Sequence, residues 1–391
     1  MMFLLKKGQL LVYGCLCCLL IACQKTDTKT LFTSIPVSQS KVDFSNGLTE
    51  TEGLNIIEYL YYYNGGGVAA GDVTGDGLPD LFFTANQGAN KLYVNQGGLR
   101  FKDATAASGI QQNGGWSTGV TMADVNGDGA LDIYVCQVGQ YKTMRGKNQL
   151  YINDGKGNFK EQAAKYGLDF VGFSTQAAFF DYDRDGDLDC YLLNHSIHDA
   201  ENYSRADIRN TRDALSGDQL LRNNGDAFED VSAAAGIFGS KIGFGLGIAI
   251  GDLNNDGWPD IYVSNDFHEN DYLYYNRGDG TFVESITTSM GHTSTFSMGN
   301  DLADVNNDGW LDVITMDMKP NDEVVNKSSV GADPYNIYQT KLSYGYHYQY
   351  PRNMLQLNRG MVRGQSNPGF SEIGHLSGIN ASDWSWAPLL S

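Results

Sequence analysis

The sequence has 391 residues, of which 12% are aromatic and 19% charged, with 47 glycines and 8 prolines. This composition is that of a globular chain rich in β-structure and turns, and it excludes a disordered protein. The formal net charge of −19 argues against nucleic acid as a partner, because phosphates select lysine and arginine surfaces, and it suits a protein that binds cations.

The N-terminus has the pattern of a signal peptide, over residues 1–22. Lys6 and Lys7 precede an apolar run at residues 10–21, which is too short to span a bilayer. The run ends in Leu-Ile-Ala-Cys, which resembles a bacterial lipobox and implies lipidation of Cys23. The alternative is an ordinary signal peptide that contains several cysteines. The lipobox predicts an outer-membrane lipoprotein of the bacterial cell envelope, held by its lipid anchor and facing the periplasm or the exterior.

The rest of the chain divides into a tether, residues 23–42, and a body, residues 43–391. An acidic segment recurs in the body, and each copy is preceded by an alternating small-residue run and followed by three strand-like segments with tight turns. The copies begin at Asp72, Asp124, Asp181, Asp252 and Asp304. Residues 195–217 and 319–352 interrupt the third and fifth units and are predicted to be loop insertions.

Four short strands repeated about every 50 residues are typical of β-propeller blades, which must stack to bury both faces of each sheet. We therefore predict an all-β fold, a β-propeller of four-stranded blades; a solenoid of the same units is the alternative. Residues 384–391 match residues 116–123, the strand that precedes a loop. The chain is thus expected to hold five blades and the start of a sixth, as an N-terminal fragment whose open ring exposes sheet edges.

The acidic segment follows the pattern D-x-[D/N]-x-D-G-x-x-D, which suits Ca²⁺, a hard cation that takes six to eight oxygen ligands. Side chains at positions 1, 3, 5 and 9 and the carbonyl at position 7 supply oxygens, and the glycine at position 6 allows a sharp turn. We expect about one ion per loop, with a structural role. The predicted ligands are Asp72, Thr74, Asp76 and Asp80; Asp124, Asn126, Asp128, Ala130 and Asp132; Asp181, Asp183, Asp185, Asp187 and Asp189; Asp252, Asn254, Asp256, Trp258 and Asp260; and Asp304, Asn306, Asp308, Trp310 and Asp312.

The loops are not equivalent. Thr74 brings no charge, so the first site is predicted to be the weakest, and Asp183 makes the third loop the most acidic and the tightest. An EF-hand is excluded because it needs a glutamate at position 12 and flanking helices. Mg²⁺ is disfavoured because it keeps several waters in strict octahedral geometry. A turn without metal is the alternative for a single copy, and five copies with the closing aspartate argue against it.

These units resemble FG-GAP/VCBS repeats, the calcium-loop blades of integrin α-subunits and of secreted bacterial proteins. The segments Tyr63–Gly97 and Trp116–Val135 are similar to bacterial lipoproteins related to cartilage acidic protein, in which an ASPIC/UnbV domain usually follows the propeller. The resemblance implies seven blades in the full protein, loop-bound calcium and a role in adhesion or ligand binding.

Candidate catalytic motifs are weak. Gly-Trp-Ser-Thr-Gly at residues 115–119 matches a nucleophile elbow, but a strand rather than a helix follows it. His195, His198 and Asp199, in an insertion, could offer two imidazoles and a carboxylate to a metal but are expected to be solvated, and His268 is expected to be a polar loop residue. No catalytic residue or organic cofactor is predicted. Cys136 and Cys190 are expected to be buried free thiols rather than a disulfide.

The tyrosine-rich segments 59–64 and 344–350 either stack on sugar rings or pack between blades, and packing is favoured. The favoured function is a non-enzymatic, calcium-stabilised, lipid-anchored binding or adhesion protein whose ligand is a glycan or another protein. The alternative is a polysaccharide-active lyase or hydrolase on a propeller scaffold. An acidic residue of the insertion beside a deep pocket would favour that alternative; the candidates are Asp199, Glu201 and Asp207.

Overall fold

The computed structural model describes residues 32–111, 113–199, 205–329, 333–362, 364 and 366–390. The chain divides into two compact units, Met1–Ser40 and Lys41–Ser391. The described part of the first unit contains the short helix α2 (Val37–Ser40). The predicted signal peptide and Cys23 lie outside the described residues. Within the described ranges, we find no helix with the length and apolar character that a membrane span requires.

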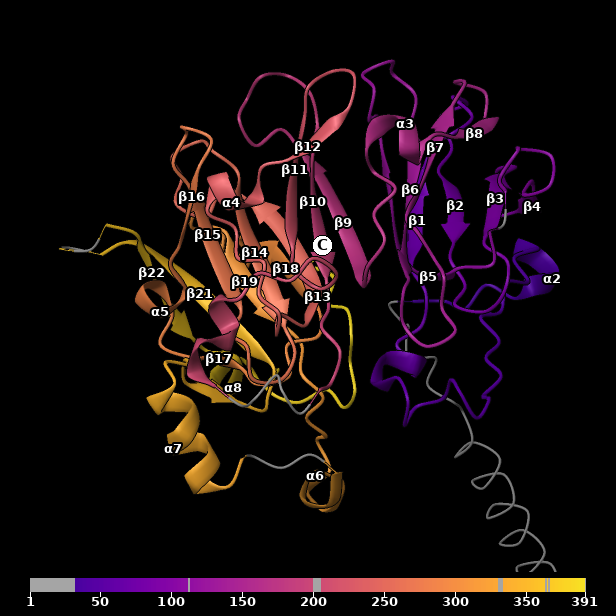
Figure 1. The fold of residues 1–391 in the computed structure, drawn as a ribbon. Coiled ribbons are helices and arrows are strands. Elements are labelled where there is room, and N and C mark those ends of the chain that lie inside the picture. Colours follow the sequence, from indigo (N-terminus) through magenta and orange to yellow (C-terminus); the bar gives the residue numbers. More distant parts are fainter. Residues whose placement is uncertain are drawn as a thin grey trace, which may run out of the picture. The chain divides into compact units, whose positions relative to one another are not determined.

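The second unit contains five antiparallel sheets of four strands, each formed by one sequence repeat, as predicted (Figure 1). We call these sheets blades 1 to 5. Their strands are β1 (Val68–Gly71), β2 (Asp80–Phe83), β3 (Lys91–Asn95) and β4 (Phe101–Asp103); β5 (Trp116–Ala123), β6 (Asp132–Val138), β7 (Gln149–Asn153) and β8 (Phe159–Glu161); β9 (Ser174–Phe180), β10 (Asp189–Asn194), β11 (Gln219–Asn223) and β12 (Phe228–Asp230); β13 (Gly245–Gly251), β14 (Asp260–Asn265), β15 (Tyr272–Asn276) and β16 (Phe282–Glu284); and β18 (Asn300–Ala303), β19 (Asp312–Thr315), β21 (Met354–Met361) and β22 (Pro368–Glu372).

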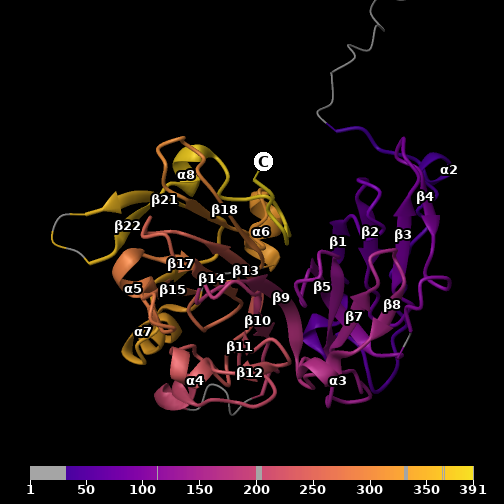
Figure 2. The same cartoon turned by 90° about the horizontal axis from the view of Figure 1, so that it is seen from above.

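Consecutive blades pack through their first strands and through shared hydrophobic clusters. The first strands contact one another in chain order, β1 with β5, β5 with β9, β9 with β13 and β13 with β18 (Figure 2). Phe82 of blade 1 shares a buried cluster with Tyr151 of blade 2, and Tyr191 of blade 3 shares one with Tyr274 of blade 4. The all-β blade arrangement is therefore confirmed, because the core lies between sheets rather than within one sheet.

The two cysteines of the body lie in one of these clusters, between blades 2 and 3. Cys136 and Cys190 are both fully buried and free, as predicted. Burial raises the pKa of each thiol, so both stay protonated near neutral pH.

Short helices follow the fourth strands and were not predicted. They are α3 (Ala163–Tyr166), α4 (Ser232–Ala235), α5 (Ile286–Ser289) and α8 (Gly374–Ser377). The strand before each ends in Asp or Glu, and its carboxylate accepts a backbone N–H at the start of the helix. The N–H of Ala163 donates to Glu161 over 2.9 Å, and that of Ile286 donates to Glu284 over 2.7 Å. This capping starts a single helical turn where the strand ends.

The two predicted insertions meet over blade 4. The first contains the 3₁₀-helix η3 (Ala206–Asn210), and the second contains α6 (Glu323–Ser329), α7 (Tyr335–Ser343) and β20 (Gln349–Tyr350), which pairs in parallel with β17 (Thr293–Ser294). The Arg209 guanidinium forms an ion pair of 2.6 Å with the buried Glu269 and donates to the Gly345 carbonyl over 3.0 Å. This buried pair ties both insertions to the 266–271 loop.

The first tyrosine-rich segment forms the 3₁₀-helix η1 (Leu60–Tyr63), not a strand face. The Tyr59 hydroxyl lies 3.0 Å from Nε2 of His195 in blade 3, and the Tyr61 hydroxyl donates to Asp266 of blade 4 over 3.1 Å. The Tyr59 ring also packs edge-on against Trp116 of blade 2. The segment thus connects three blades, which explains why Tyr59, Tyr61 and Tyr62 are buried, whereas Tyr63 at the end of η1 is exposed.

These contacts correct one prediction. His195 is not solvated: it is 1% exposed, and its Nδ1 lies 2.7 Å from the Ser196 carbonyl. Burial lowers its pKa to about 4, so the imidazole is neutral at physiological pH. His198 is likewise packed, with its ring stacked on Phe244. Sequence reasoning could not predict this packing, because the aromatic partners of the two histidines come from segments far apart in the chain.

Candidate functional site

The five acidic loops connect the first and second strands of the blades and share one hydrogen-bond pattern. The carboxylate at position 1 accepts two backbone N–H groups of its own loop. In the second loop, the backbone N–H of Asp128 donates to the Asp124 carboxylate over 3.0 Å, and the backbone N–H of Gly129 donates to it over 2.8 Å. Corresponding pairs of bonds occur in the other four loops. Position 1 therefore shapes the turn in addition to offering oxygen atoms.

The aspartate at position 9 is buried in every loop and joins the loop to the third strand of its blade. Asp132 accepts the N–H of Val125 over 3.1 Å and that of Asn153 over 2.8 Å. Burial raises the pKa of Asp132 to about 6, because desolvation outweighs these two bonds. The same cause raises the pKa of Asp189 and of Asp260 to about 7 each. These carboxylates are costly to ionise unless positive charge is nearby.

The third loop differs from the others in its geometry. Ligand oxygens of Asp181, Asp183 and Asp189 all lie within 4.8 Å of one another, and this is the one such acidic group among the described residues. In the second loop the Asn126 amide donates to Asp128 over 2.9 Å, a bond that a carboxylate at that position cannot make. One buried oxygen of Asp183 and one of Asp187 have no hydrogen-bond partner. These oxygen atoms fit a hard divalent cation.

The other predicted ligands are placed as follows. Asn254 and Asn306 repeat the Asn126 bond, donating to Asp256 and Asp308 over 2.9 Å each. Thr74 lies 3.4 Å from Asp72 through its hydroxyl. Asp185 lies outside the acidic group of the third loop. The side chains at position 3 are therefore turned toward carboxylates of their own loops.

The second residue of each loop lies between blades. It is buried in the first four loops but not in the fifth. The exposed fractions are 1% for Val73, 2% for Val125, 3% for Tyr182, 0% for Leu253 and 40% for Val305. In blades 1 to 4 this second residue is thus packed in the hydrophobic clusters between sheets, while the tip of the loop stays exposed.

The candidate catalytic motifs do not form a reactive site. Ser117 lies inside β5, and its hydroxyl accepts a hydrogen bond of 3.0 Å from the Gln137 amide. Asp207 is exposed and lies 3.4 Å from Arg205. Glu201 lies outside the described residues.

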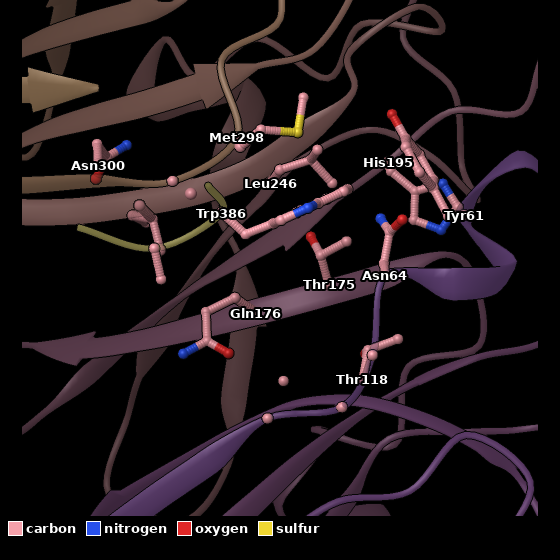
Figure 3. A pocket seen from close by; sticks show the side chains of 18 of the residues that line it. Tyr61, Asn64, Thr118, Thr175, Gln176, His195, Leu246, Met298, Asn300 and Trp386 are labelled. Carbon is pink, nitrogen blue, oxygen red and sulfur yellow. The ribbon is translucent and has the colours of Figure 1, made fainter. Parts of the chain in front are cut away.

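A second candidate site is a cavity of about 360 Å³ between the first strands, which we call the inner-strand cavity (Figure 3). One equivalent position in every repeat, six residues before the first loop aspartate, lines it. This position is occupied by Gly66, Thr118, Thr175, Leu246 and Met298. The cavity was not predicted, although aligning the repeats would have shown that this position varies while the residue after it is glycine in every blade but the third.

The C-terminal segment lines the same cavity. A Cβ atom on Gly247 would lie 2.9 Å from the Gly299 Cα, and one on Gly299 would lie 2.3 Å from the Trp386 carbonyl oxygen. The backbone of Trp386 and Ala387 therefore packs closely on blade 5 at Gly299, just as the backbone of blade 5 at Gly299 packs on blade 4 at Gly247. This contact agrees with the sequence match to a sixth first strand, and it places the Trp386 side chain in the cavity (Figure 3).

Comparison with known families decides the assignment of the repeats. The model of the FG-GAP-like repeat matches residues 59–135, 138–192, 205–263 and 252–315, which together make up more than half of the chain. The chain belongs to the FG-GAP-like repeat family. This finding confirms the resemblance inferred from the acidic loops, and the matched segments of this FG-GAP repeat protein include all five of them.

The FG-GAP repeat protein is also similar to cartilage acidic protein 1. It is 29% identical to the mouse (Mus musculus) protein over 52% of this chain, 28% identical to the human (Homo sapiens) protein over 57%, and 26% identical to the frog (Xenopus tropicalis) protein over 63%. The aligned parts span 29%, 31% and 39% of those relatives. The similarity supports the resemblance to cartilage-acidic-protein-like chains.

Among solved structures, similarity is found to an Agrocybe aegerita lectin that recognises non-reducing terminal N-acetylglucosamine. The match has a TM-score of 0.38 and 17% identity, over 78% of this chain and 65% of the lectin chain. Bap1, a biofilm matrix protein of V. cholerae, matches with a TM-score of 0.33 and 15% identity, over 63% of this chain and 34% of its own. Both are loose matches.

Proposed function

We propose that this FG-GAP repeat protein is a calcium-stabilised, lipid-anchored binding or adhesion protein of the bacterial cell envelope, with no catalysis of its own. Its ligand is a glycan or another protein at the cell surface, and it does not act on nucleic acid. The observation that carries the calcium part is the third loop, where three carboxylates converge and two buried oxygens lack partners. Like charges placed this closely are stable when a cation lies among them.

The residues that would hold the ion fit its chemistry. Asp181, Asp183 and Asp189 offer carboxylate oxygens, the ligands that Ca²⁺ prefers, and Asp187 has a further unpartnered oxygen beside them. A bound Ca²⁺ supplies positive charge that offsets the repulsion of the loop. Because the ligand geometry exists only in the folded chain, binding stabilises that state by mass action.

A binding role is supported by what the inner-strand cavity contains. Of the described residues that line it, none is Asp, Glu, Lys or Arg, so it lacks the pair of carboxyl groups that most glycoside hydrolases use. Neither Asp199 nor Asp207 is among these lining residues. No observation favours the enzymatic alternative.

The direct test of the calcium proposal is metal analysis of the purified chain with a thermal melt. We expect uptake of about one Ca²⁺ per loop and a melting temperature that rises with Ca²⁺ and falls with EGTA. Absence of uptake at millimolar Ca²⁺ would contradict the proposal.

The anchor is tested separately. Labelling of expressing cells with a palmitate analogue should mark the protein, and a Cys23→Ser variant should lose both the label and membrane fractionation. A label that persists in Cys23→Ser would refute anchoring at that residue.

A further inference from the structure

We propose that the inner-strand cavity binds a single neutral saccharide residue, held by stacking on Trp386 and by hydrogen bonds to the side-chain amides of Asn64 and Gln176. This inference rests on the proposed binding function and names both its site and the chemical class of its ligand. All three residues line the same cavity (Figure 3): Asn64 follows η1, Gln176 lies in blade 3 and Trp386 lies in the C-terminal segment.

The first argument is charge. The chain carries a net charge of −19, yet the cavity lining contains no Asp, Glu, Lys or Arg among the described residues. The one titratable imidazole, His195, is held neutral by burial, which lowers its pKa to about 4. A charged ligand would lose its hydration there without meeting an opposite charge, and that loss disfavours it strongly. The cavity therefore selects neutral ligands.

The second argument is unused hydrogen-bonding capacity. The side-chain amides of Asn64 and Gln176 line the cavity, and within the described part of the chain neither makes a hydrogen bond. Each amide offers donors and an acceptor side by side. The hydroxyls of Thr118 and Thr175 donate to the Ser174 and Gly245 carbonyls, over 2.7 Å and 2.8 Å, which leaves their lone pairs as acceptors. Adjacent sugar hydroxyls, each a donor and an acceptor, match this set.

Gln176 is a departure from the repeat pattern. The other four blades have glycine at this position, five residues before the first loop aspartate: Gly67, Gly119, Gly247 and Gly299. A Cβ atom added to Gly119 would lie 1.8 Å from Oε1 of Gln176, so the glutamine side chain extends along the first strand of blade 2. In the other blades, glycine at this position allows the backbones of neighbouring blades to approach closely. In blade 3 the Gln176 side chain stands at this position and lines the cavity.

The third argument is shape. Trp386 contributes a flat apolar ring to the cavity lining, and within the described part of the chain it makes no ring–ring contact with another aromatic side chain. The C–H face of a pyranose stacks on such a ring as other flat apolar surfaces do. The volume of about 360 Å³ is near the lower end of the roughly 300–1,000 Å³ of small-molecule sites. One sugar residue suits it better than an extended chain.

The test is titration of the purified chain with the methyl glycosides of glucose, galactose, mannose and N-acetylglucosamine, followed by calorimetry and saturation-transfer NMR. Glucuronic acid and glucosamine serve as charged counterparts. We expect at least one neutral glycoside to bind and both charged sugars to bind at least about tenfold more weakly. Trp386→Ala and Gln176→Ala should each weaken binding about tenfold or more.

Matched controls separate the cavity from the rest of the surface. Trp384, two residues from Trp386, is 56% exposed and lies outside the cavity lining, and Gln339 is exposed on α7. Trp384→Ala and Gln339→Ala should leave the affinity within about twofold. The melting temperature of every variant, with and without Ca²⁺, reports whether the fold is intact.

The outcomes distinguish this inference from the proposed function. Glycoside binding that survives Trp386→Ala and Gln176→Ala overturns the site, while a glycan-binding role stands. Equal binding of charged and neutral sugars overturns the ligand class. Absence of binding by every glycoside overturns the inference even when Ca²⁺ still raises the melting temperature, and the proposed function then stands with a protein ligand. Loss of the Ca²⁺ effect alone refutes the calcium proposal and leaves the cavity result valid.

Discussion

The side-chain amide of Asn358, in blade 5, donates a hydrogen bond of 2.9 Å to the backbone carbonyl of Leu253, the second loop residue of blade 4. The last residue of the third strand makes the corresponding bond in other blades. Asn153 donates to Val73 over 2.9 Å, Asn223 to Val125 over 3.4 Å and Asn276 to Tyr182 over 2.8 Å. This asparagine therefore ties each blade to the acidic loop of the blade before it.

We expect Asn153→Ala to lower the unfolding free energy by about 1–3 kcal/mol, because it leaves the buried carbonyl of Val73 and the half-buried carbonyl of Leu131 without their donor. The matched control is Asn95→Ala. The Asn95 amide donates to Pro79 of its own blade over 2.8 Å, and among the described residues it has no partner in another blade. Urea denaturation of both variants measures the difference. Equal losses would show that the inter-blade bond contributes nothing beyond the local one.

Asp183→Asn should change stability in opposite directions with and without calcium. In EGTA the variant should be more stable than the parent by about 0.5–1.5 kcal/mol, since one half-buried charge disappears and the new amide can donate to Asp185 as Asn126 donates to Asp128. In saturating Ca²⁺ its melting temperature should rise less than that of the parent, because one charged ligand is missing. Asn126→Asp is the reciprocal control and should show the reverse pattern. If Asp183→Asn were less stable than the parent in EGTA, the carboxylates of the third loop would not repel one another as we infer.

Removing a predicted calcium ligand should lower the unfolding free energy more in the second loop than in the first. The Asp128 carboxylate accepts hydrogen bonds of 2.9 Å from the Ala130 N–H and the Asn126 amide, whereas the Thr74 hydroxyl makes one long bond of 3.4 Å. Asp128→Ala should therefore reduce the unfolding free energy in Ca²⁺ by about 1–2 kcal/mol more than Thr74→Ala. Thermal and urea unfolding in the same buffer compare them. The ranking of the two sites fails if the costs are equal.

Asp266 should make stability depend on pH. Burial raises its pKa to about 8, despite the hydrogen bonds that it accepts from Phe267 and Tyr61, and the nearby Asp317 adds to the rise. Its pKa in the unfolded chain is about 3.9. Between these values the folded chain binds more protons than the unfolded chain, so the unfolding free energy falls as pH rises, by at most about 1.4 kcal/mol per pH unit for this group.

Asp266→Asn should remove that contribution. Compared with the parent, the variant should gain stability between pH 5 and pH 8, as measured by urea unfolding at both values. Asp207→Asn, at an exposed position, is the control and should track the parent. If the unfolding free energies of the parent and the variant changed with pH in parallel, Asp266 would be ionised in the folded chain over the whole range from pH 5 to pH 8.

The blades and their acidic loops could be predicted because both are local patterns that repeat. Each loop places Asp, Gly and Asp at fixed spacing, and each strand alternates within a few residues of a turn. The inter-blade contacts could not be predicted in this way. The Asn358–Leu253 bond spans 105 residues, and the Tyr59–His195 contact spans 136. Nothing near either residue in the sequence indicates its partner.

The site was predicted in part for the same reason. Loop composition identified Asp183 as the residue that sets the third loop apart, and the structure places it in the one acidic group of the described chain. Calcium itself remains a prediction. Trp386, Asn64 and Gln176 were missed because each is unremarkable in its own segment, and they meet only when first strands from several blades lie side by side.

The burial of the second loop residue has a consequence for how the chain acquires its structure. Val73, Val125, Tyr182 and Leu253 are each covered by the repeat that comes later in the sequence, whereas Val305 is 40% exposed. During synthesis, each blade therefore buries this residue only when the next blade folds against it, so folding is expected to proceed from the N-terminal blade to the C-terminal one. Interrupting synthesis after any repeat would leave the second loop residue exposed in the last blade and buried in the earlier blades.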